Sequence, residues 1–112
     1  MYDSDATLGA GTTAFTTSEE ITNTSGTAYT SGGATLTSVT PVADSTTAVC
    51  DFADVSFSSA TFTANGALIY NSSATNAAVA AIAFGSDKTA TNGTFTIQFP
   101  AADASNAIIR LA

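Results

Sequence analysis

The sequence predicts an all-β protein, a small antiparallel β-sandwich or barrel of about six to eight short strands with an extended N-terminal arm. Apolar and polar residues alternate along several short segments, as they do in strands whose two faces have different surroundings. Clusters of Gly, Ser, Asn and Asp separate these segments at intervals of about 8 to 12 residues, which is typical of such folds. No tract carries the i, i+3, i+4 spacing of a long amphipathic helix. The length of 112 residues is that of one domain.

The first 18 residues are mostly Thr, Ala, Ser and Gly, and their few apolar residues keep no period. We therefore expect residues 1–18 to form an extended arm that is ordered by what it lies against. Residues 19–112 are expected to form the single domain. Gly-containing turns at 24–26 and 31–33 would enclose a short segment at 27–30.

Two strands are predicted next, at residues 34–41 and 47–52, and a turn at residues 44–46 joins them. Pro41 should end the first strand or confine it to a sheet edge, because proline has no N–H to donate to a ladder. The apolar register shifts by one after the second strand. We therefore expect a bulge or a strand break near residues 53–54.

The central strand is expected at residues 61–70, the longest segment with clean alternation, after a turn at residues 58–59. One face of this strand would carry Phe62, Ala64, Gly66, Leu68 and Tyr70. If Leu68 lies in the core, Leu68→Ala should cost roughly 2 to 5 kcal/mol through the cavity that it leaves.

After a turn at 71–73, the Ala-rich residues 77–84 favour a helix by propensity, but they are too few for a stable one and lie between turn signals. We predict a strand there. A loop at 85–93 and a strand at 94–99 follow, with Phe95, Ile97 and Phe99 pointing inward and Pro100 ending the strand. A turn at 103–106 precedes a last strand at 107–111.

The residues that can build a core are scarce. Leu, Ile, Val and Phe together number 22, about a fifth of the chain. Because small domains bury a small share of their surface, thin packing suggests that partner subunits supply part of the stability.

The charge balance excludes several classes of partner. Nine Asp and Glu oppose two Lys and Arg, there is no His, and the net charge is −7. Nucleic acid and anionic membranes are bound by clusters of cations that this chain lacks. The longest apolar run, residues 77–84, is far shorter than a transmembrane helix. Residues 1–5 are acidic and no apolar segment follows, so we expect no signal peptide and synthesis in the cytoplasm.

No catalytic, cofactor or metal site is predicted. The paired carboxylates are interpreted as turn caps and solubilising groups, since Asp and Glu in acid–base catalysis need a partner group in a cleft. They are Asp3 and Asp5, Glu19 and Glu20, and Asp51 and Asp54. A calcium loop of the D-x-[DN]-x-[DN]-G type is absent from the sequence.

Cys50 is the only cysteine, so it forms no intrachain disulfide, and without His it lacks the usual activating base. We interpret it as a small buried hydrophobic residue on a strand. Tyr2, Tyr29 and Tyr70 are expected to pack at the edge of the core, with an interface role as the alternative. Lys88 and Arg110 are expected to form local ion pairs.

Several stretches resemble a widespread family of small tailed-bacteriophage virion proteins, most of them uncharacterised. They are residues 29–36 (YTSGGATL), 51–57 (DFADVSF), 66–71 (GALIYN), 84–88 (FGSDK) and 99–110 (FPAADASNAIIR). Longer relatives have an N-terminal helix and a first strand before the region that matches residues 8–15. Lacking that strand, this chain would leave a sheet edge open, and open edges tend to pair with another chain.

The resemblance implies a non-enzymatic structural protein of a virion. The role that we expect is a capsid decoration (cement) protein on the outside of the shell, with the major capsid protein as partner and residues 1–18 as the binding arm. A homo-oligomer, with three copies at a local threefold axis, is the expected stoichiometry. The alternatives are a tail, neck, fibre or adaptor component, and a small-ligand or carbohydrate-binding β-domain. The last is least favoured, because the chain has no Trp and most Phe occupy inward strand positions.

Overall fold

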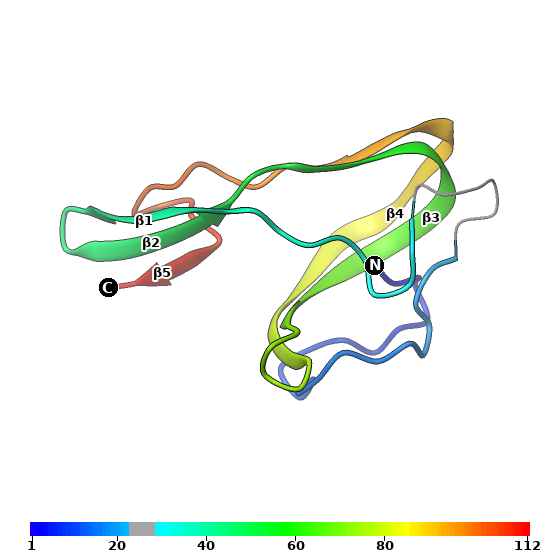
Figure 1. Ribbon diagram of the computed structural model, residues 1–112, viewed down its shortest axis with the longest axis horizontal. Coiled ribbons are helices and arrows are strands. Elements are labelled where there is room, and N and C mark those ends of the chain that lie inside the picture. Colours follow the sequence, from blue (N-terminus) through cyan, green and yellow to red (C-terminus); the bar gives the residue numbers. More distant parts are fainter. Residues whose placement is uncertain (23–28) are drawn as a thin grey trace. The chain divides into compact units, whose positions relative to one another are not determined.

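The computed structural model describes residues 1–22 and 29–112. The predicted turn at 24–26 lies outside the described residues, as do residues 27 and 28 of the segment at 27–30. The described residues are all-β, without a helix (Figure 1). The strands are β1 (Ser38–Asp44), β2 (Thr47–Phe52), β3 (Val55–Asn71), β4 (Ala77–Ile97) and β5 (Ile109–Leu111). They form two antiparallel sheets, β1–β2–β5 and β3–β4. The all-β prediction is confirmed, but the described residues form five strands where six to eight were expected, and the sandwich or barrel stays a prediction.

The chain divides into two compact units. The hairpin unit comprises Met1–Gly33 and Phe57–Phe95, and the three-stranded unit comprises Ala34–Ser56 and Thr96–Ala112. The predicted boundary between an arm and a domain after residue 18 stays a prediction.

Long strands dominate the hairpin unit, and here two turn predictions are wrong. The expected turn at 58–59 lies within β3, and the expected loop at 85–93 lies within β4. Ser59, Gly85 and Asn92 instead have left-handed backbone conformations, with φ values of 55°, 77° and 47°. A single left-handed residue is a common way to insert a bulge, after which the ladder continues. The turn-forming residues therefore bend the strands without ending them.

Segments from the first 22 residues pair with both strands of the hairpin. The Tyr2 N–H donates to the Gly66 carbonyl (3.0 Å), and Tyr2 also forms a bridge with Glu20. Farther along, Ala14 forms a bridge with Ala77 at the start of β4. The N-terminal segment is thus held by backbone hydrogen bonds within its own chain.

The alternation predicted for residues 61–70 holds only in part. Phe62 and Ala64 are buried as expected, but Ala67 is buried in place of Leu68, which is half-buried. The N–H groups of Asn65 and Gly66 both donate to the Tyr2 carbonyl, so two residues of β3 oppose one residue of its neighbour. Such a bulge moves the following side chains to the other face.

Aromatic rings form the core of the hairpin unit. Phe62 lies 4.9 Å from Phe95 and 5.9 Å from Tyr29, measured between ring centroids. Tyr29 is also 5.5 Å from Phe57. Such tilted and edge-on pairs add to the free energy of burial.

The three-stranded unit follows the prediction more closely. The turn after Asp44, strand β2 and the break at residues 53–54 are confirmed. Pro41 does not end β1, but it does lie on an edge strand, as the alternative stated. The register shifts by one between Val39 and Val42, so Pro41 lies in a bulge, where a missing N–H breaks no ladder bond.

Candidate functional site

A cluster of polar groups in the hairpin unit surrounds the carboxylate of Glu20. Its Oε1 accepts hydrogen bonds from the Tyr29 hydroxyl and the Gly32 N–H, both 2.7 Å long. Its Oε2 accepts one from the Ser31 hydroxyl at 2.6 Å. The Met1 amino group in turn donates to the Tyr29 oxygen at 2.5 Å. The cluster therefore ties residues 29–32 to Glu20 and to the start of the chain.

The electrostatics of this cluster favour an ionised Glu20. Burial by itself would raise the pKa of its carboxyl, but the hydrogen bonds from Ser31, Tyr29 and Gly32 hold the pKa below its usual value. Burial, followed by the hydrogen bond to Glu20, raises the pKa of Tyr29, so its hydroxyl stays protonated and donates. Burial lowers the pKa of the Met1 amino group to about 6, although the charge of Glu20 opposes this. The hydrogen-bond donors of Met1, Tyr29, Ser31 and Gly32 all have acceptors within the cluster, so the cluster serves to stabilise the fold.

The structure brings together three carboxylates that the sequence had placed in two separate pairs. One oxygen from each of Asp3, Asp5 and Glu19 lies within 4.8 Å of the others. Asp5 and Glu19 are exposed, and Asp3 is half-buried. Asp3 Oδ1 accepts a hydrogen bond from the Asp5 N–H (2.9 Å), which is the turn-capping role expected of it. Exposed acidic residues often gather at turns, and nothing at this cluster points to a bound ion.

Carboxylates of the three-stranded unit also cap backbone groups. Asp54 Oδ1 accepts from the Phe99 N–H (2.9 Å), which joins two segments that are distant in the sequence. Asp44 Oδ2 accepts from the Ala104 N–H at 2.7 Å. Asp51, the other member of the predicted pair, lies on β2, and its Oδ1 is buried without a hydrogen-bond partner. Of this pair, Asp54 therefore stabilises the fold by accepting a backbone hydrogen bond.

The tyrosines lie deeper than expected. Tyr2 is only 1% exposed, and its hydroxyl donates to the Thr16 carbonyl at 2.6 Å. Tyr29 is buried too, whereas Tyr70 is half-buried and stacks on Phe15 with 4.7 Å between the ring centroids. The prediction of edge packing is wrong for Tyr2 and Tyr29, because both side chains are buried and each hydroxyl has an acceptor within the chain.

Three further residues were predicted to be buried (Cys50) or to form ion pairs (Lys88 and Arg110). Cys50 is half-buried and not fully buried. Lys88 Nζ donates to the Ser86 hydroxyl (3.0 Å). Arg110 donates to the backbone carbonyls of Ala104 and Ser105. The hydrogen bonds of both cations thus go to neutral oxygens.

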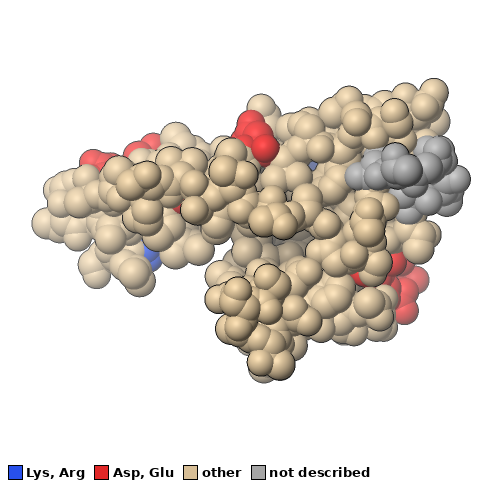
Figure 2. All heavy atoms as spheres, viewed as in Figure 1, with Lys and Arg blue, Asp and Glu red and all other residues tan. Residues whose placement is uncertain are grey.

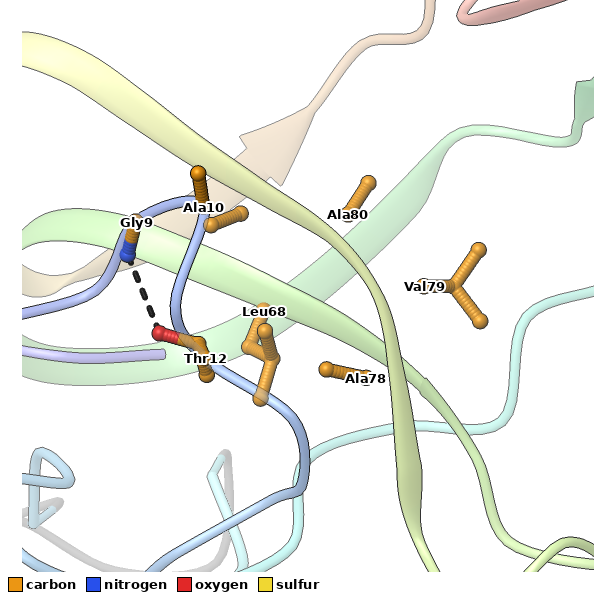
Figure 3. A pocket seen from close by; sticks show the side chains of 8 residues that line it. Gly9, Ala10, Thr12, Leu68, Ala78, Val79 and Ala80 are labelled. Atoms are coloured by element: carbon orange, nitrogen blue, oxygen red, sulfur yellow. Dashed lines mark hydrogen bonds between the residues drawn. The ribbon is translucent and has the colours of Figure 1, made fainter.

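A hollow of about 270 Å³ lies at the turn end of the hairpin (Figure 3). Its lining comes from the chain at Gly9, Ala10 and Thr12, from Leu68 on β3, and from residues 78–81 on β4. Thr12 supplies the only side-chain hydroxyl of this lining, and it already accepts a hydrogen bond from the Gly9 N–H (3.0 Å). The side chains that line the hollow are therefore mainly apolar, and none of them is an acid or a base. The run of alanines in residues 77–84 is the sequence feature that could have indicated this hollow.

The surface in Figure 2 is largely uncharged, and its Asp and Glu atoms form a few separate groups. Among the residues that the structure describes, no helix has the length and apolar character needed to cross a membrane. Comparison of the chain with protein families, with curated proteins and with solved structures found no match.

Proposed function

We propose that the chain is a non-enzymatic structural protein of a bacteriophage virion that binds the outside of the capsid as a decoration (cement) protein. Its partner would be the major capsid protein, and it would act as a homo-oligomer, with a trimer at the local threefold axis as the expected form. The resemblance of residues 29–36, 51–57 and 66–71 to phage virion proteins supports the virion location.

The thin core is the observation that carries the assembly role. Twelve apolar residues are buried among those that the structure describes, and five of them are alanines. Tyr2 and Val49 are the only large side chains among them that are less than 2% exposed. Burial stabilises by about 25 cal/mol per Å² of apolar surface, so a core of this size contributes little for 112 residues. Contact with a partner surface would add what the core does not supply.

The long strands of the hairpin favour the same conclusion. Among the described residues, isolated bridges join other parts of the chain to these two strands at Gly66 on β3 and at Ala77 on β4. The strands have 17 and 21 residues. Long edges of this kind offer backbone N–H and C=O groups to an added strand from another protein.

The location and copy number of the chain in purified virions test the proposal. A capsid decoration protein should be seen on the shell in hundreds of copies by cryo-electron microscopy and quantitative mass spectrometry. A dozen copies or fewer on the tail axis would instead favour the tail or neck alternative. Absence from virions that otherwise contain their structural proteins would refute the proposal.

The predicted binding arm needs a mild perturbation. Deleting residues 1–18 would remove Tyr2, which is buried against β3, and would damage the fold itself. Exposed positions such as Thr7 and Ala10 are suitable for substitution by Asp. If the arm binds the shell, these variants should fold normally but occupy capsids less. Unchanged occupancy would exclude a binding role for this part of the arm.

A further inference from the structure

Two Asn-Gly pairs lie in the long strands of the hairpin, Asn65-Gly66 on β3 and Asn92-Gly93 on β4. Asparagine deamidates spontaneously most readily before glycine, because glycine has no side chain to hinder the approach of its backbone nitrogen. Every other asparagine of the chain precedes Ala, Ser or Thr. Since the two pairs have the same chemistry, the structure around each one decides which of them reacts.

The reaction takes place within the chain and then consumes water. The glycine backbone nitrogen attacks Cγ of the asparagine, so that an N–Cγ bond forms, the Cγ–Nδ2 bond breaks, and the N–H proton leaves with the nitrogen as ammonia. Water then opens the cyclic succinimide at either of its carbonyl groups, which gives aspartate or iso-aspartate. Both the side-chain amide and the glycine N–H must be able to move, so hydrogen bonds that hold them should slow the reaction.

Both reacting groups of Asn65-Gly66 are held by the fold. Asn65 Nδ2 donates to Asp87 Oδ1 (2.8 Å), and the Gly66 N–H donates to the Tyr2 carbonyl (3.3 Å). Both residues are half-buried, and a Cβ placed on Gly66 would lie 2.8 Å from the Ile82 carbonyl oxygen, so the backbone has little room to turn. Deamidation here would first require local opening, which reduces its rate by the small population of the open form.

The surroundings of Asn92-Gly93 hold this pair less tightly. Asn92 is exposed and has a left-handed φ of 47°. Its backbone N–H donates to a side-chain atom, Thr61 Oγ1 (2.9 Å), so the regular ladder between β3 and β4 is interrupted here. Beyond the adjacent residues, the nearest described atom to a Cβ placed on Gly93 is the Thr91 carbonyl oxygen, 3.6 Å away. The backbone at this bulge therefore has room to turn.

We propose that Asn92 is a site of spontaneous deamidation in the folded protein, whereas the fold protects Asn65. Either product adds a negative charge to a chain whose net charge is −7. Iso-aspartate also adds a carbon atom to the β4 backbone between the buried Ala90 and Phe95, whose ring lies 4.9 Å from that of Phe62. This linkage should displace Phe95 and loosen the aromatic core of the hairpin unit. The modification does not depend on the virion role.

Storage of the full chain in mildly alkaline buffer, followed by peptide mapping, tests the proposal. Trypsin cuts after Lys88 and so separates the two Asn-Gly pairs. Tandem mass spectrometry then distinguishes Asn92 from Asn106 in the C-terminal part. In the folded chain, Asn92 should deamidate faster than Asn65 by on the order of tenfold or more, because only Asn65 requires local opening. In urea, where both pairs are unfolded, the two rates should be similar.

Gly93→Ala is the matched variant, because its methyl group hinders the attack and the structure has room for it. It should slow the reaction of Asn92 in the folded chain and in urea, and leave that of Asn65 unchanged. Equal rates at the two asparagines in the folded chain would overturn the proposal. So would an Asn92 that reacts in urea but not in the folded chain, or one whose rate Gly93→Ala leaves unchanged.

The effect on the core has its own control in Asn92→Asp, which has the charge of the products without the added backbone atom. The deamidated chain, separated from the unmodified one by anion exchange and rich in iso-aspartate, should unfold at a lower urea concentration than Asn92→Asp. Equal unfolding midpoints of these two proteins would refute the displacement of Phe95.

Discussion

Replacing Glu20 by Gln tests whether the Glu20 cluster stabilises the hairpin unit. The carboxylate accepts three hydrogen bonds, from Tyr29, Ser31 and Gly32. Gln keeps the shape but loses the charge, and one oxygen becomes an NH₂ group that no longer accepts from Ser31. A bond to a charged group is worth about 1 kcal/mol more than a neutral one. Because Glu20 is only half-buried, water reduces this difference, and we expect a total loss of about 1 to 2 kcal/mol.

The pH dependence of stability is the sharper measurement. The folded state holds the pKa of Glu20 below its usual value, which in an unfolded chain is about 4.3. Its contribution is therefore fully present above that value, and it is lost as the pH falls through the lower, folded pKa. Between neutral pH and pH ~3, the wild type should lose more stability than Glu20→Gln. The difference between the two proteins should shrink toward zero in acid.

Urea unfolding followed by tyrosine fluorescence is a suitable assay. The chain has no Trp, and Tyr2, Tyr29 and Tyr70 all belong to the hairpin unit, so the signal reports on that unit. Glu19→Gln is the matched control, since it removes the same charge from the exposed neighbouring residue. Equal stability of wild type and Glu20→Gln at neutral pH, or parallel pH profiles, would refute a stabilising role for the cluster.

Two further substitutions test the packing of β3. Gly66→Ala would place a Cβ 2.8 Å from the Ile82 carbonyl oxygen. It should therefore lower the free energy of unfolding, measured with urea, by about 1 to 3 kcal/mol. Gly9→Ala is the control, because its Cβ meets no atom within 4 Å and the change should be nearly neutral. Unchanged stability of Gly66→Ala would contradict the close approach of the two strands. Phe62 is only 6% exposed, so Phe62→Ala should lower the free energy of unfolding by about 3 to 5 kcal/mol. Leu68 is half-buried beside the hollow, so Leu68→Ala should lower it by less than the roughly 2 to 5 kcal/mol expected of a core position. Thermal unfolding of both variants measures the order, and a larger loss for Leu68→Ala would reverse the assignment of the core.

Local chemistry predicted the three-stranded unit well. The turn at residues 44–46, the strand at 47–52 and the break at 53–54 follow from turn residues and short-range alternation, which act over a few neighbouring positions. The same local signals failed at Ser59 and Asn92. A left-handed residue is compatible with a turn and with a bulge, and only the neighbouring strand decides between them.

The candidate site could be predicted only in its parts. The carboxylate pairs were visible, and capping was the role expected of them. Glu20 differs from Glu19 because residues 29–32 return to surround it, and no local pattern signals that return. Likewise, Tyr2 is buried because it pairs with β3 at Gly66, a position far along the chain.

By itself, the sequence determined the all-β class and the negative net charge, because strand propensity, alternation and charge are properties of single residues and near neighbours. The proposal of a virion role also rests on short motifs of the sequence. The tertiary structure alone decided which turn signals became bulges and which side of β3 is buried after Gly66. Those features depend on pairing between distant segments, and a shift of one residue in such pairing moves every following side chain to the opposite face.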